Sequence, residues 1–175
     1  MIADGADEVL VRAREQLMQG ASQIELTAGG GVASPFSPLD VSTFTSAELQ
    51  AAVDAAGNWG TYVTVHAYTP QAIQRAIAAG VKCIEHGHLM DEETARLMAE
   101  KGIWLSMQPF LNAEDMIPLP PGSEQEAKHM EVIAGTDRAY ALAKKYGIKT
   151  AFGTDTLFSA ALAKRQGAQL AKLVR

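Results

Sequence analysis

The chain has 175 residues and a formal net charge of −5, with 47% hydrophobic and 20% charged residues. This length suits one domain with a sizeable core, and the negative charge argues against nucleic acid or an anionic membrane surface as the main partner. The first residues show no signal-peptide pattern, no run approaches the roughly 20 apolar residues of a membrane span, and Cys83 is the single cysteine, so we expect a cytoplasmic protein.

The predicted elements alternate between helix and strand. A helix at about 5–18 comes first. Short runs with strand-like composition or alternation then follow at 23–28, 62–67, 83–87, 103–108 and 150–154. Because helices separate successive strands, the sequence predicts βαβ units and a parallel sheet.

Capping signals mark the helices between these strands. The starts carry Thr45 with Glu48, Thr69 before Pro70, Asp91, and Ser123 with Glu126. Glycines close three of the helices, at Gly80, Gly102 and near Gly147. A last helix is predicted at about 159–174.

The regular spacing of the strands fits either a (β/α) barrel or a doubly wound sheet. Five strands are too few for a closed barrel, so we predict a partial (β/α)8 TIM-type barrel with about five parallel strands and flanking helices, as one incomplete domain over 1–175. Two turn-rich loops, at 29–38 and 114–123, follow strands and therefore lie on the face where α/β enzymes place their sites.

Polar side chains recur at the ends of the strands. Alternation turns Glu25 and His66 toward the interior, and His86 and Asp155 stand at corresponding strand ends. Two histidines and a carboxylate are the ligands that a catalytic zinc ion prefers, and a further carboxylate can accept a proton from its bound water. One strand-end histidine or aspartate alone more often has a structural role, but recurrence on three strands favours a site.

Other polar residues are weaker candidates. We expect His88 to be a loop residue, His129 to be solvated in mid-helix, and the glycine run at 29–31 to belong to a flexible loop rather than a phosphate cradle. Cys83 and Glu85 fall opposite His86 on the alternation, which predicts that they face the helices.

Several motifs resemble the metal-dependent amidohydrolase superfamily, in the branch of imidazolonepropionase-like and Xaa-Pro dipeptidase-like enzymes. The segment at 64–105, "TVHAYTP…EHGHLMDEETARLMAEKGIWL", is similar to that family's strand 5 to strand 7 region, "AFGTDT" to its strand 8, and "QIELTAGGGVASP" to its strand 4. The resemblance implies strands 4 to 8 of a (β/α)8 barrel whose enzymes hydrolyse amide or related bonds with one or two divalent metals.

The resemblance also implies residue roles. His66 and His86 match the strand 5 and strand 6 metal ligands, and Asp155 matches the strand 8 ligand and proton shuttle. Tyr68 is a substrate contact, and Glu25 stands where many members carry a carboxylated lysine. The strand 1 His-x-His pair is absent from this sequence, so we expect at most one ion, most simply zinc, held by His66, His86 and Glu25.

Two functions follow. The first is a hydrolase of amide or peptide-like bonds in a small substrate, such as a dipeptide or an N-acyl amino acid, with weak or no activity for this chain alone. The second is a non-catalytic half-barrel. In either case the exposed edges of the first and last strands predict a homo-oligomer.

Overall fold

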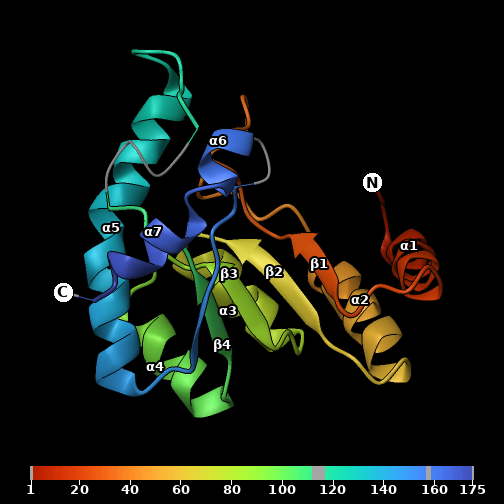
Figure 1. Cartoon of the computed structure of the whole chain (residues 1–175). Helices are drawn as coiled ribbons and strands as arrows, with labels where there is room; N and C mark the ends of the chain where they lie inside the picture. The colour runs from red at the N-terminus through yellow and green to blue at the C-terminus, as the bar shows by residue number, and fades with distance from the viewer. Residues whose placement is uncertain (1, 112–116, 157–158, 175) are drawn as a thin grey trace.

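The computed structural model describes residues 2–111, 117–156 and 159–174. In these parts of the chain one sheet of five parallel strands has the order β1-β2-β3-β4-β5, and Figure 1 labels β1 to β4 side by side. The strands are β1 Ile24–Thr27, β2 Val63–Ala67, β3 Cys83–His86, β4 Trp104–Met107 and β5 Thr150–Phe152. The helices are α1 Ala6–Met18, α2 Ser46–Asn58, α3 Pro70–Ala78, α4 Glu92–Lys101, α5 Glu124–Tyr146, α6 Ala160–Ala163 and α7 Gln166–Ala171. The predicted alternation of helices with five parallel strands is confirmed.

The two faces of the sheet differ in chemistry. The face toward the helices carries the apolar residues of the strands, among them Val63, Val65, Ile84 and Leu105, and these pack with α1 to α5 in one buried core. Burial of this apolar surface is the main force that holds the sheet against its helices. The opposite face carries the polar residues. One face of the sheet is therefore buried and apolar, and the other can hold reactive side chains.

The strand register decides which polar residues share that second face. Side by side in the parallel ladder, Thr27 pairs with His66 and His66 pairs with Glu85. Because paired residues in a parallel sheet point to the same side, these three side chains lie on the polar face together. A smaller apolar cluster, which includes Val32 and Phe110, packs beyond the carboxyl ends of the strands and supports the loops there.

The predicted helix starts agree with the structure in position, and several caps have the expected hydrogen bonds. Thr45 and Glu48 form the full capping box of α2. The side chains of Asp91 and Ser123 accept from backbone amides at the starts of α4 and α5. Thr69 precedes α3 without a side-chain cap bond.

The prediction of one helix at about 159–174 is wrong. The described chain there forms two short helices, α6 and α7, separated around Lys164 and Arg165. A run of small and charged residues supplies little apolar surface to hold a continuous helix in place. Within the described residues, no helix combines the length and the apolar character that crossing a membrane requires.

Candidate active site

A cavity of about 330 Å³ lies at the carboxyl ends of the strands. Its walls come from the ends of β1 to β3, from the loop at 29–38 after β1, from the segments after β4 and β5, and from α6. It is lined by Glu25, Thr27, Gly31, Val32, Ala33, Ser34, Ser37, His66, Tyr68, His86, Phe110, Ile117, Asp155 and Leu162. The five residues predicted to form the site therefore share one cavity.

Three rings form the floor of this cavity. The His66 and His86 ring centroids are 4.4 Å apart, and Tyr68 stacks on His86 at 4.6 Å and meets His66 edge-on at 5.1 Å. His86 and Tyr68 are buried, whereas His66 is half-buried. Packing of each ring against the other two limits its movement, so the imidazoles are held in place before any ligand binds.

His86 enters the cavity because the backbone turns at the end of β3. Its φ of 77° lies in the left-handed region, which is uncommon for a residue other than glycine. The register pairs His86 with Ala67, whose side chain lies in the core against the helices. The turn thus carries the His86 ring away from the face that strand alternation would give it.

The prediction that Cys83 and Glu85 face the helices is wrong. Cys83 pairs with Thr64, and the Thr64 hydroxyl donates to the Glu85 carboxylate at 2.8 Å, which places both residues on the polar face. The apolar Ile84 between them lies in the core and was the signal that could have set the faces correctly. Glu85 is the acidic residue near the site whose position the sequence argument missed.

The surroundings of the histidines favour their neutral forms. Burial lowers the pKa of His86 well below its ordinary value, and the neighbouring imidazoles lower it further. Burial also lowers the pKa of His66, although a hydrogen bond to Gly30 and the nearby Asp155 carboxylate oppose the change. Neutral imidazoles can accept a proton or ligate a metal ion.

Burial shifts the pKa values of the two carboxyl groups in the cavity in the opposite direction. Partial burial raises the pKa of Glu25, and repulsion from Glu85 and Asp155 adds to it. Partial burial likewise raises the pKa of Asp155, while the adjacent His66 lowers it. A carboxyl group whose pKa is raised toward neutrality is suited to accept and return a proton.

The donors in this cavity suit a divalent cation in type. The buried Nδ1 atom of His86 has no hydrogen-bond partner in the described structure, and two carboxylates line the cavity with no Lys or Arg among its described lining residues. However, no three His, Cys, Asp or Glu side chains of the described residues lie close enough together to hold an ion. The ligand types fit, but the described side chains do not form a complete coordination shell.

The other two histidines are both buried. His88 follows β3 as predicted, but it is fully buried, stacks on Phe110 at 5.3 Å, and donates from Nε2 to the Gln108 carbonyl at 3.0 Å. The prediction that His129 is solvated is wrong, because α5 turns the face that carries His129 and Val132 inward. Neither residue lines the cavity.

Two loops were predicted to border the site. The loop at 29–38 does so, and its Gly30 carbonyl accepts a hydrogen bond from His66 Nε2 at 2.8 Å. Of the second loop, at 114–123, residues 114–116 lie outside the described residues, and Ile117 lines the cavity.

Comparison with known proteins identifies the fold and its family. The profile of the Amidohydrolase family matches residues 1–174. The chain belongs to the amidohydrolase family. Its five strands and their helices match part of the barrel of a solved amidohydrolase with a TM-score of 0.86 and 40% identity, over 99% of this chain and 43% of that one.

Two further proteins are similar along most of the chain. The ochratoxinase of Aspergillus niger is 35% identical over 162 residues, which are 89% of this chain and 33% of the relative. A Xaa-Pro dipeptidase solved with methionine in its active site is 31% identical, with a TM-score of 0.80 over 97% of this chain and 43% of the other. This amidohydrolase chain thus spans less than half the length of the proteins it matches, and the predicted likeness to Xaa-Pro dipeptidases is confirmed.

Proposed function

We propose that this chain carries part of the active site of a hydrolase that cleaves an amide bond to an amino acid, as in an N-acyl amino acid or a dipeptide. The observation that carries the proposal is that His66, His86, Glu25 and Asp155 line one cavity of an amidohydrolase fold, where burial lowers the pKa of both imidazoles and raises the pKa of both carboxyl groups. The similarity to an ochratoxinase and to a Xaa-Pro dipeptidase with methionine in its active site supports a small substrate with an amino-acid moiety.

Backbone strain supports a functional role for two of these residues. Among the described residues other than glycine, three have a positive φ: Phe36 at 56°, His86 at 77° and Asp155 at 49°. His86 and Asp155 both line the cavity. Residues with such strained backbone angles are common at functional sites, where the position of a side chain matters more than local stability.

A divalent cation, with zinc as the first choice, would complete the proposed site. His66 and His86 would hold it with Glu25 as the third ligand, and at most one ion is expected. When bound, such an ion polarises water or the amide carbonyl. It would also balance the two carboxylates, which face no cationic side chain among the described lining residues.

The chain's own residues supply the proton transfers and the substrate contacts. Asp155 takes a proton from the attacking water and returns it to the nitrogen that leaves when the amide C–N bond breaks. The Tyr68 hydroxyl stays protonated, because burial raises its pKa, and it can donate to a substrate oxygen. Val32, Phe110 and Leu162 give the cavity an apolar wall that suits a hydrophobic side chain.

The test is turnover of N-acyl amino acids and Xaa-Pro dipeptides by the wild type and by His66→Ala. We expect the substitution to lower kcat/KM by about 100-fold or more, since it removes one of the two imidazoles that would hold the cation. Tyr62→Ala, which alters an exposed side chain just before the opposite end of β2, is the control. Turnover that persists unchanged in His66→Ala would show that the site assignment is wrong.

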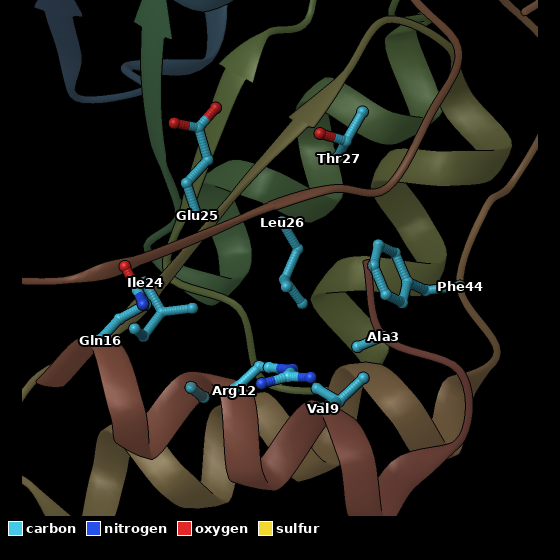
Figure 2. Close-up of a pocket in the computed structure, with 10 residues that line it drawn as sticks. Ala3, Val9, Arg12, Gln16, Ile24, Glu25, Leu26, Thr27 and Phe44 are labelled. Carbon is cyan, nitrogen blue, oxygen red and sulfur yellow. The ribbon is translucent and has the colours of Figure 1, made fainter. Parts of the chain in front are cut away.

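A second candidate is a half-barrel that associates with itself. It is supported by the open edge of β1, where a groove of about 350 Å³ lies between α1 and β1. Figure 2 shows Leu26 and Phe44 in this groove beside Val9 and Arg12 of α1. An unpaired strand edge beside apolar side chains invites pairing with another chain. Cytoplasmic location stays a prediction from the sequence for both candidates.

A further inference from the structure

Lys128 of α5 is a buried lysine. Its side chain is only 8% exposed, and its ammonium group donates to the backbone carbonyls of Ser34 at 2.8 Å and Ser37 at 3.0 Å. The Glu124 carboxylate, one turn earlier on the same helix, lies 3.5 Å from Nζ. Because burial of an ammonium group is unfavourable unless acceptors surround it, these contacts are specific rather than incidental.

The two carbonyls belong to the segment at 29–38, which we call the glycine loop. Within it the Gly31 amide donates to the Ser37 hydroxyl at 3.2 Å, which ties the two ends of the loop together. Gly30 packs so tightly that an added Cβ would lie 1.7 Å from the Pro38 carbonyl oxygen. The glycine loop is thus a closed unit, and α5 holds it from outside.

The same loop contacts the site at its other side. Gly31, Val32, Ala33, Ser34 and Ser37 line the cavity. The Gly30 carbonyl accepts from His66 Nε2 at 2.8 Å, and because a carbonyl can only accept, Nε2 carries the proton and Nδ1 is left with a free lone pair. Hydrogen bonds at both ends of the glycine loop, joined by the backbone of the loop, therefore connect Lys128 with His66.

We propose that Lys128 is a positioning residue that fixes the glycine loop against the cavity and, through Gly30, sets the orientation and tautomer of His66. Its importance for catalysis rests on the proposed function, since it requires that His66 act in the site. Its effect on the loop and on the His66 ring does not, and both can be measured without a substrate.

The first experiment is limited proteolysis of the full chain with chymotrypsin. Phe36 lies in the glycine loop and is 94% exposed. Lys128→Met should raise the rate of cleavage after Phe36 by about tenfold or more, because the loop loses two hydrogen bonds to a charged group and opens more often. Lys128→Arg, which keeps a cationic donor, should stay within about threefold of the wild type.

Two controls separate local from global effects. Lys145 also lies on α5, and Lys145→Met, which removes an exposed ion pair with Glu92 of α4, should leave cleavage after Phe36 unchanged. Cleavage after Trp59 and Tyr62, which are exposed and outside the loop, should not change in Lys128→Met. If Lys128→Met does not fold, Lys128→Gln, which keeps one amide donor, replaces it.

The second experiment measures the ¹⁵N shifts of the His66 ring in the metal-free chain. The wild type should show the Nε2–H tautomer of His66. Lys128→Met should show a mixture of both neutral tautomers. A folded Lys128→Met or Lys128→Gln with wild-type cleavage after Phe36 and wild-type His66 shifts would overturn the proposal. If Lys128→Met is cleaved faster after Phe36 and shows mixed His66 tautomers, but the wild type has no measurable turnover, the positioning role is supported and the proposed reaction is not.

Discussion

The Glu48 carboxylate joins the starts of two helices. It accepts hydrogen bonds from the Gly5 amide at 2.8 Å, the Thr45 amide at 2.7 Å and the Thr45 hydroxyl at 2.8 Å. The bonds to the Thr45 and Gly5 amides, together with that to the Thr45 hydroxyl, lower the pKa of Glu48 below its ordinary value of 4.5. One side chain therefore caps α2 and anchors the residue before α1.

Glu48→Gln should lower the free energy of unfolding at pH 7 by about 1–2 kcal/mol, since a hydrogen bond to a charged group is worth about 1.5–3 kcal/mol and an amide keeps part of it. The folded pKa is lowered, so this stabilisation is fully present above pH 4.5 and is lost as the pH falls through the folded pKa. Urea unfolding at pH 7 and near pH 3.5 should show the difference between wild type and variant shrinking. Glu100→Gln, at an exposed ion pair, is the control; an equal difference at both pH values would contradict this account.

At the scale of elements, β1 differs from the strands inside the sheet because only β2 pairs with it. Glu25 and Thr27 are exposed for this reason, and Leu26 is only partly buried beside the groove with α1. The same edge that leaves Glu25 accessible to solvent also offers unpaired backbone groups. Association through β1 would cover the groove.

Sedimentation should therefore detect a dimer or a larger oligomer of the wild type at micromolar concentration. Leu26→Lys places a charge in the groove and should shift the chain toward monomer. Val11→Lys places the same charge on the exposed side of α1, where Val11 is 50% exposed, and should leave the assembly unchanged. A wild type that sediments as a monomer would contradict association through this edge.

The helices and strands also show which structural features the sequence patterns could predict. Caps at Thr45, Asp91 and Ser123 and the glycine after α5 located helices closely, because these signals act within one turn. The assignment of faces on β3 failed because it started from His86, whose positive φ takes its ring off the alternation. The turn at His86 depends on tertiary contacts, whereas the apolar Ile84 was a sequence signal that could have set the faces of β3.

At the scale of the molecule, the chain is one side of an amidohydrolase barrel with its polar face open. Its site residues could be predicted because parallel strands bring their carboxyl ends to one edge. The burial of Lys128 and His129 could not, because it depends on how the long helix α5 packs over segments distant in the sequence. The strand topology therefore predicts which residues lie at the carboxyl ends of the strands, but it does not predict how α5 packs against distant segments.

The most direct test of the central claim is the zinc content of the purified chain, measured by inductively coupled plasma mass spectrometry after loading and desalting. Because two imidazoles and one carboxylate are the protein ligands of a single catalytic zinc site, we predict at most one ion per chain. His66→Ala and His86→Ala should each reduce this value to background. A content near two ions, or an ion content that neither substitution reduces, would contradict the site described for this cavity.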